Sequence, residues 1–492
     1  MHNRSWIIPL ALLLVATAAH SQERTLTLTL PQAVEQAQEQ SPDAATARHA
    51  YRAAYWSYRA YRANYLPAVT LTSSPELNRA INKVAQPDGT VKFVDQSLLD
   101  TDLRLSVSQN IAWTGGNLFV ETNAQRIDQL SDHSGMWATQ PVNIGYSQAL
   151  FGYNALKWDR RIEPIRYREA KKTYVETLEL VAAEATRRFF NLATAQSNYL
   201  TACVNYANAD TLYAYARGRY DIGTVTENEM LQLEVNKLSE ETNRMNAQIE
   251  VENREQELRA YLRMPEGVSL RTEVDDSVPD LRLSLDEALT MARLNSPDIE
   301  NMLRRQAEGE SAVAKAKADA GLKVDLYMRF GLTQTARTLR SAYQRPLDQQ
   351  YVSLGITLPL LDWGRGKGKV RVARSNRDLI NTQVEQDKVD FEQNVRKLVM
   401  QFNLQAQRVR VAARTDQTAQ RRADVARKLY LLGKSTVLDL NASISEKDRA
   451  RRDHISALYN YWSLYYTLRS ITLYDFGARR QLAPSLEQLI DK

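Results

Sequence analysis

Two motifs, far apart in the chain, place acidic side chains directly after a glycine turn. Each has the form R-x-x-Y-x-x-G-x-x-T, over Arg217–Thr226 and Arg427–Thr436. The carboxylates that follow them are Glu227, Glu229 and Asp439. Carboxylates that come close together repel one another and favour bound cations. Ordinary first-turn carboxylates, which stabilise the start of a helix, explain these three residues equally well.

The motifs themselves predict turns between helices. A glycine after a basic, tyrosine-containing last turn, with a threonine close behind it, is typical of one helix stopping and another starting. Six residues mark the two predicted turns: Tyr220, Gly223, Thr226, Tyr430, Gly433 and Thr436. The chain is expected to reverse direction at both.

No catalytic constellation accompanies these residues. Two of the five histidines lie at the N-terminus, and His49, His133 and His454 lack the spacing of metal ligands. Neither a phosphate-binding loop nor a G-x-S-x-G elbow occurs. The single cysteine, Cys203, excludes an internal disulfide and any cysteine-based metal site. The sequence predicts a protein that is not an enzyme and has no metal or cofactor.

The N-terminus has the features of a cleavable secretory signal. Arg4 precedes the apolar run Trp6–Val15, and an A-x-S site ends at Ser21. We predict a signal peptide over residues 1–21. After it, no stretch approaches the roughly 20 apolar residues that a membrane-spanning helix requires.

Matching segments recur in the same order in the two halves of the chain. The pattern L-x-L-x-x-A, followed by S-P-D, occurs over Leu28–Asp43 and again over Leu283–Asp298. The alternating segments Leu103–Val107 and Val352–Ile356 form a second pair, and the two turn motifs form a third. Three ordered matches predict an internal duplication. Two long units with unlike elements are too few and too large for a solenoid.

Several segments have the period-two alternation of β-strands. The clearest are Leu322–Thr333, Val352–Leu358 and Leu103–Ser108. Strands of about 9–11 residues with one apolar and one charged face suit an outer-membrane barrel, but a soluble sandwich has the same alternation. Further strand-like segments at 117–122 and 142–150 have no assigned place.

Long helices are predicted between the strands. Residues 154–220 and 364–432 contain no proline except Pro164. Roughly 67 residues give a helix of about 100 Å, far above the globular norm. In the second segment apolar residues recur at coiled-coil spacing: Phe391, Val395, Leu398, Phe402 and Val409.

Shorter helices are expected to return the chain to its starting level. They span about residues 226–262 and 286–320, and by the duplication residues 436–474 stack with an N-terminal helix over 31–65. The turn-rich segment 264–282 and the C-terminal tail are candidates for a belt around a helical tunnel.

Basic residues cluster twice, each time after a predicted strand. The clusters are Lys157, Arg160, Arg161, Arg166 and Arg168, and Arg365, Lys367, Lys369, Arg371, Arg374 and Arg377. One such run resembles an RNA-binding segment. Because it is repeated at both strand-to-helix junctions, and the net charge of +6 is otherwise interspersed, we favour a basic zone just below a membrane and predict no nucleic-acid partner.

Taken together, these features resemble the TolC-like outer-membrane efflux protein family over nearly the whole mature chain. The resemblance rests on the duplicated L-x-L-x-x-A start, on both Y-x-x-G-x-x-T turns and on three strand boundaries. Those boundaries are Tyr65-Leu66-Pro67, Ser147–Phe151 and Thr357–Gly364. Each motif is weak singly, but their order and spacing make the combination specific.

The resemblance implies a mixed α and β fold: a homotrimer with four strands per chain in a 12-stranded outer-membrane barrel, continued by a periplasmic α-barrel. It also implies recruitment by a periplasmic adaptor and an inner-membrane pump, with the hairpin tips contacting the adaptor and closing the tunnel. Tyr430 and Asp439 match the family's gate. Ser435 and Ala442 occupy its basic and second acidic positions, so the familiar gate network is altered. Glu227 and Glu229 on the first-half turn are candidates to supply acidic groups instead, and with Asp439 they form the candidate gate.

The predicted organisation follows from the duplication. Residues 22–282 form the first repeat, 283–474 the second and 475–492 a C-terminal tail. The favoured function is a passive outer-membrane duct for efflux or type I secretion, which extends into the periplasm and contacts outer-membrane lipid. A secreted or periplasmic coiled-coil adhesion protein is the alternative, and a periplasmic adaptor is a third. The sequence does not name the exported substrate.

Overall fold

The computed structural model describes residues 24–483, so the predicted signal peptide lies outside the described residues. The chain divides into two compact units, each drawn from both halves of the sequence. The sheet unit consists of Thr46–Glu179, Arg282–Gln401 and the described residues from Leu468 onward. The hairpin unit consists of Leu180–Leu281, Phe402–Thr467 and the described residues up to Ala45.

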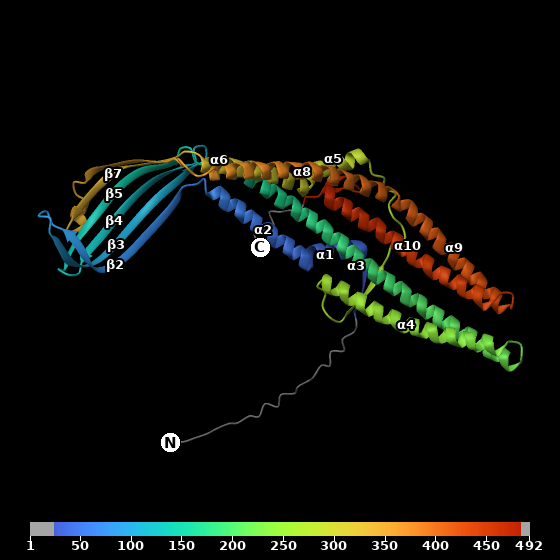
Figure 1. The fold of residues 1–492 in the computed structure, drawn as a ribbon. Helices are drawn as coiled ribbons and strands as arrows, with labels where there is room; N and C mark the ends of the chain where they lie inside the picture. Colours follow the sequence, from blue (N-terminus) through green and yellow to red (C-terminus); the bar gives the residue numbers. More distant parts are fainter. Residues whose placement is uncertain (1–23, 484–492) are drawn as a thin grey trace, which may run out of the picture. The chain divides into compact units, whose positions relative to one another are not determined.

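One antiparallel sheet of six strands dominates the sheet unit (Figure 1), in the order β2-β3-β4-β5-β7-β8. Its strands are β2 (Ala68–Ala85), β3 (Val91–Ile111), β4 (Gly116–Gln129), β5 (Ser134–Ala149), β7 (Lys323–Ala336) and β8 (Leu347–Thr357). The expectation of four strands per chain is therefore wrong. The segments 117–122 and 142–150 lie in β4 and β5, a hairpin between β3 and β7. A short helix, α7 (Leu339–Ala342), lies between β7 and β8.

Serine–proline steps interrupt two helices that the sequence analysis predicted as continuous. One is split into α1 (Leu30–Gln40) and α2 (Pro42–Ala63), the other into α5 (Leu285–Asn295) and α6 (Pro297–Ala320). A residue before proline is sterically pushed out of the α region. Both intervening serines are extended, with ψ of 154° and 139°. The Ser296 hydroxyl then accepts a hydrogen bond from the backbone N–H of Asp298, which caps α6.

The two long helices differ from each other. Helix α3 (Ala155–Asp221) is a single helix of 67 residues that continues through Pro164, as predicted. The second is divided at Leu404 into α8 (Arg365–Asn403) and α9 (Gln405–Leu431), so one continuous helix was a wrong prediction. All five residues of the predicted coiled-coil seam are buried.

The hairpin unit is helical apart from a two-stranded parallel sheet of β1 (Arg24–Thr29) and β6 (Val268–Glu273). Helix α3 leads by a turn into α4 (Glu227–Tyr261), and α9 leads into α10 (Val437–Thr472). Its most deeply buried side chains include Phe189, Leu192, Leu233, Leu258, Leu440 and Leu458. After α10 the chain forms a small hairpin of β9 (Tyr474–Asp475) and β10 (Arg480–Gln481).

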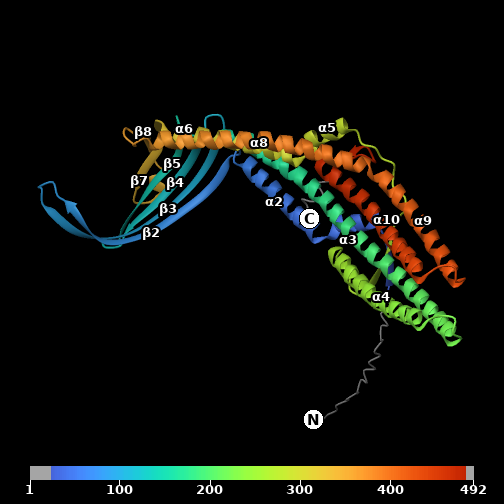
Figure 2. The ribbon, with the colours of Figure 1, turned by 45° about the vertical axis from the view of Figure 1, so that its right-hand side comes forward.

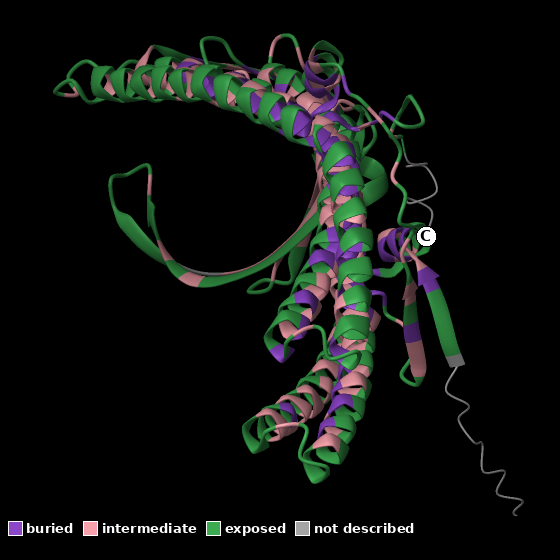
Figure 3. Cartoon of the chain, turned by 90° about the vertical axis from the view of Figure 1, so that its right-hand side faces the viewer, coloured by how far each residue is buried: buried purple, intermediate pink, exposed green. Residues whose placement is uncertain are grey.

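Burial differs sharply between helices and sheet. Most buried residues lie in the helices, whereas most residues of the long strands are exposed or intermediate (Figure 3). Within residues 24–483, no second layer covers the apolar side chains of the sheet.

Candidate functional site

The six strands share one apolar face. Across each neighbouring pair, apolar residues stand opposite one another, and directly opposed residues lie on the same face of a sheet. Examples in strand order are Leu71–Leu105, Val107–Val120, Val120–Ile144, Ile144–Phe330 and Leu326–Leu354. Many of these side chains are exposed, with Leu71 at 65% and Leu354 at 56%. An exposed apolar band of this extent requires an apolar environment or a partner.

The opposite face is polar. Asp325 and Arg329 lie on it, while Leu326 and Phe330 lie on the apolar face, as the alternation predicted. The Arg329 guanidinium of β7 is 3.7 Å from the Glu121 carboxylate of β4, across strand β5, which lies between them. The sheet thus separates a charged, hydrated surface from an apolar one.

Large apolar side chains stand exposed where the sheet meets the helices. Trp113 follows β3, Phe151 follows β5, and Leu360 and Trp363 follow β8. The Trp363 side chain is 90% exposed. Tryptophans placed at one end of an apolar band are typical of a membrane–water interface.

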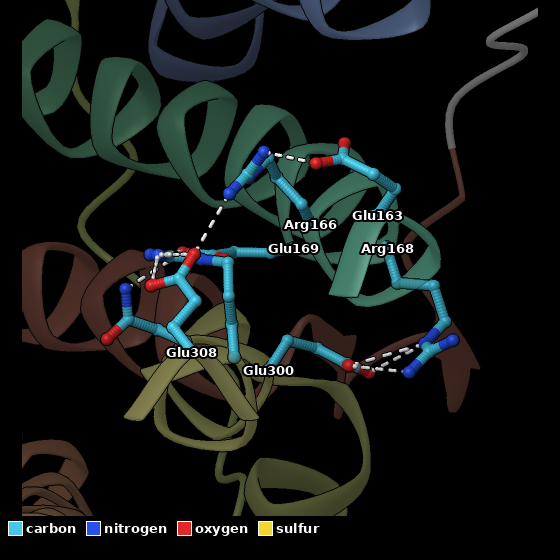
Figure 4. Close-up of polar contacts among 8 residues, drawn as sticks. Glu163, Arg166, Arg168, Glu169, Glu300 and Glu308 are labelled. Carbon is cyan, nitrogen blue, oxygen red and sulfur yellow. Dashed lines mark hydrogen bonds and ion pairs between the residues drawn. The ribbon is translucent and has the colours of Figure 1, made fainter. Parts of the chain in front are cut away.

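The first basic run is paired within the chain. Arg161 contacts Glu310 on α6. Arg166 lies 2.9 Å from Glu308, and Arg168 lies 3.1 Å from Glu300 (Figure 4). One ion pair has the opposite polarity: Arg304 of α6 lies 2.6 Å from the Glu169 carboxylate of α3. Because α6 carboxylates hold these arginines, the run joins two helices of the sheet unit.

The second basic run has a different setting. Lys367, Arg371 and Arg374 line a hollow of about 520 Å³ together with Trp363 and Leu360. Basic groups beside exposed apolar side chains suit the boundary between apolar and aqueous surroundings.

The two predicted turns have the same backbone construction. Gly223 has φ of +73° and Gly433 has φ of +68°, a left-handed conformation that glycine adopts without strain. Each glycine N–H donates to the carbonyl of its motif tyrosine, at 2.8 Å to Tyr220 and 2.9 Å to Tyr430. A second bond reaches back from the next residue in each turn, closing the preceding helix.

Both motif threonines cap the helix that follows. The Thr226 hydroxyl accepts from the Glu229 N–H at 3.3 Å, and the Thr436 hydroxyl accepts from the Asp439 N–H at 3.1 Å. The hydroxyl of Thr436 also donates to the Asp439 carboxylate at 2.7 Å. The threonine spacing in the motif is therefore explained by helix capping.

The two motif tyrosines differ in burial. Tyr430 is 5% exposed and lies in a cluster formed by the helix pair α3–α4 and the helix pair α9–α10. Tyr220 is 39% exposed. The cluster consists of Leu212, Ala216, Leu233, Tyr430, Val437 and Leu440. Burial and the negative charge of Glu229 raise the pKa of Tyr430. The first-half carboxylate therefore lies near the second-half tyrosine, which sequence spacing alone did not reveal.

The candidate gate carboxylates have separate surroundings within one chain. Glu229 faces Tyr430, the Asp439 carboxylate accepts a hydrogen bond from the Thr436 hydroxyl, and Glu227 is exposed. The hydrogen bonds from Thr436 hold the pKa of Asp439 below its usual range, and Arg422 adds to this. Asp439 is thus held as a carboxylate.

Two further features concern the described residues. None of their helices is both long and apolar enough to cross a membrane. Over residues 24–483, histidine, cysteine and carboxylate side chains form no group of three that would hold a metal ion.

The outer membrane efflux protein family matches residues 288–480, which confirms the resemblance to TolC-like proteins; that family is one of channels and not of enzymes. No curated protein sequence matches the chain. Among solved structures, the Campylobacter jejuni CmeC outer membrane channel is similar at 16% identity and a TM-score of 0.64, covering 94% of this chain and 88% of that one. The Vibrio cholerae outer membrane protein VceC has 15% identity and a TM-score of 0.63, covering 90% and 95%. At such identities the likeness shows the fold alone, that of outer-membrane efflux channels.

Proposed function

We propose that the chain is an outer-membrane exit duct for efflux or type I secretion. The observation that carries this proposal is the apolar band that runs without a break across all six strands. When the band faces lipid, its apolar side chains lie in an apolar environment, and the polar face borders a water-filled passage. Trp113 and Trp363 lie at the periplasmic boundary of the bilayer, with the second basic run beside Trp363.

In this proposal the duct is passive and works with other proteins. Three copies assemble, and a periplasmic adaptor connects them to an inner-membrane pump, which supplies the energy. The adaptor meets the two helical turns in the periplasm, at Tyr220, Gly223, Thr226, Tyr430, Gly433 and Thr436. Two turns per chain with the same backbone construction offer two sets of three contacts around a trimer.

Cell fractionation tests this location. Expressed with its signal, the protein is expected in the outer membrane, extractable only with detergent, and of trimeric mass in native mass spectrometry. The coiled-coil adhesion alternative, favoured by the buried seam of α8 and α9, predicts a soluble protein instead. Recovery of a soluble monomer from periplasm or medium contradicts the duct.

The carboxylates near the turns are proposed to act as the gate. Glu229 and Asp439 from three copies meet at the narrow end, where their charges favour cations. The double variant Glu229→Gln with Asp439→Asn is expected to change conductance or cation block in planar bilayers without loss of the trimer. Glu234→Gln, farther along α4, is the control. Wild-type conductance and block in the double variant contradict the gating role and leave both carboxylates only the role of stabilising the start of a helix.

A further inference from the structure

The sheet ends in two open strands. Within the described residues, β2 pairs only with β3, and β8 pairs only with β7. Each outer edge therefore presents a row of backbone N–H and C=O groups without partners. Inside a bilayer every such group must be satisfied, so open edges are not tolerated in lipid. Since six alternating strands leave β2 and β8 running in opposite directions, the β8 edge of one copy can pair antiparallel with the β2 edge of another.

The two edges have matching lengths. Strand β8 has 11 residues. Strand β2 is longer, but β3 pairs with β4 only from Leu98 onward, and Leu98 stands opposite Asn78. Beyond that point β2 and β3 continue as a two-stranded ribbon that projects past the other strands (Figure 2). The part of β2 that belongs to the full sheet is thus residues 68–78, which equals β8 in length.

The apolar faces fix the pairing. On β8 the apolar face carries Leu354 and Ile356, and on β2 it carries Val69 and Leu71. Opposed residues must share a face, so Ile356 opposite Val69 and Leu354 opposite Leu71 continue the band, while a slip by one residue breaks it. This register aligns all of β8 with residues 68–78. Pro75 has no N–H, so at most one hydrogen bond is missing.

The same register gives a regular barrel. Within the chain, direct pairing leads from Ala68 of β2 through each strand to Tyr351 of β8. In the closing ladder Tyr351 stands opposite Ser74 of the next copy, six residues along β2 from Ala68. One residue of stagger per strand is the ratio of the eight-stranded barrel of shear 8, whose strands tilt by about 36°. That tilt lies within the usual range of about 35–45°.

We propose that β8 of each copy pairs with β2 of a second copy in this register, and that three copies close an 18-stranded barrel, six strands from each. The inference rests on the trimer of the proposed function; two copies would close only 12 strands. Because barrel diameter grows roughly in proportion to strand number, the outlet is about one and a half times as wide as the 12-stranded barrel implied by the resemblance.

Disulfide trapping tests the pairing. In a Cys203→Ser background, Leu71→Cys combined with Leu354→Cys places the two sulfurs on opposed residues of neighbouring copies, within bridging distance. Oxidation of the full-length protein in membranes is expected to give a covalent ladder that ends at three copies. The matched control is Leu71→Cys with Gln350→Cys, four residues out of register on the same face, which is expected to remain unlinked.

Each result has a defined meaning. A ladder that ends at two copies overturns the 18-stranded barrel in favour of a dimer. A trimer in native mass spectrometry that links only through the control pair, or through neither, overturns the register and leaves the proposed function intact. A soluble monomer overturns both. An end view of the trimer by cryo-electron microscopy is expected to show 18 strands, and a 12-stranded ring contradicts the proposal.

Discussion

The two halves of the chain form closely similar helical turns but different amounts of sheet. Residues 22–282 contribute four strands to the six-stranded sheet, β2 to β5, whereas residues 283–474 contribute two, β7 and β8. Each half nevertheless contains a helix break at Ser-Pro, a long helix or helix pair, and a glycine turn capped by threonine.

The difference shows where this fold tolerates change. An added β-hairpin such as β4–β5 satisfies its own backbone and extends the sheet, because β3 and β7 pair with its two outer edges as they would with each other. The glycine turns tolerate less change, because the helices on both sides of each turn bury residues in the shared cluster around Tyr430. We propose that the halves are repeats that diverged in the sheet.

A first comparison tests whether the strands of both halves share one apolar surface. Leu105→Arg on β3 and Leu326→Arg on β7 each place a charge in the apolar band. Both should destabilise the membrane-embedded form by about 2–4 kcal/mol if they lie near the midplane. Heat dissociation of the assembled protein measures this. Ser106→Arg and Ser353→Arg, on the polar face, are the controls; a harmless Leu105→Arg removes the first-half strands from the lipid surface.

A second comparison sets the buried turn tyrosine against its exposed counterpart. Tyr430→Ala removes a side chain from the shared cluster and is expected to cost about 3–5 kcal/mol, by analogy with other buried aromatic truncations. Tyr220→Ala should cost less than about 0.5 kcal/mol. Urea unfolding of the purified protein followed by circular dichroism compares them. Equal costs contradict the asymmetry between the turns.

The turns and the sheet also show which features of the fold the sequence predicts and which it does not. Glycine turns and Ser-Pro steps act locally, so Gly223, Gly433 and the turn boundaries were predictable. Strand β5 was predictable only in part: residues 142–150 have the pattern of a strand, but the register shift between Thr139 and Asn143 interrupts the alternation before them.

Tertiary packing accounts for other missed features. The burial of Tyr430 depends on residues brought in from α3 and α4, far from it in sequence. Likewise, the basic run of α3 gives no sequence signal that α6 carboxylates pair with it. The expectation of four strands per chain was taken from the family resemblance and therefore did not include the β4–β5 hairpin.

A smaller effect concerns one carboxylate in the sheet unit. Burial and the charge of Asp298 raise the pKa of Glu176 to about 7. A folded-state pKa above the unfolded value means that the folded chain holds the proton more tightly. Stability is therefore greatest below the ordinary pKa and falls as pH rises toward 7. Counted back from the turns, the second-half counterpart of Glu176 is Gln386.

Glu176→Gln makes the first half resemble the second at this position. We expect the variant to exceed the parent in stability by about 1 kcal/mol at pH 8, after allowance for solvent screening, and to match it near pH 4. Thermal dissociation at both values measures this, with Glu385→Gln on the exposed face of α8 as the control. A difference that is independent of pH contradicts the assignment.

A further comparison tests the equivalence of the caps. Thr226→Ala and Thr436→Ala each remove one N-cap hydrogen bond and should cost about 0.5–2 kcal/mol. Thr436 also donates to Asp439, so its loss should be the larger of the two. Local hydrogen exchange at the starts of α4 and α10 reports both. No change at either site means that the turns do not depend on these caps.

The most direct test of the duct is the conductance of the purified full-length protein in a planar lipid bilayer. The account predicts discrete, reproducible current steps from a detergent-extracted trimer, because a closed amphipathic sheet encloses a water-filled passage. Preparations without the protein give the baseline. A protein that inserts and remains trimeric but gives no steps under any ionic condition contradicts the account.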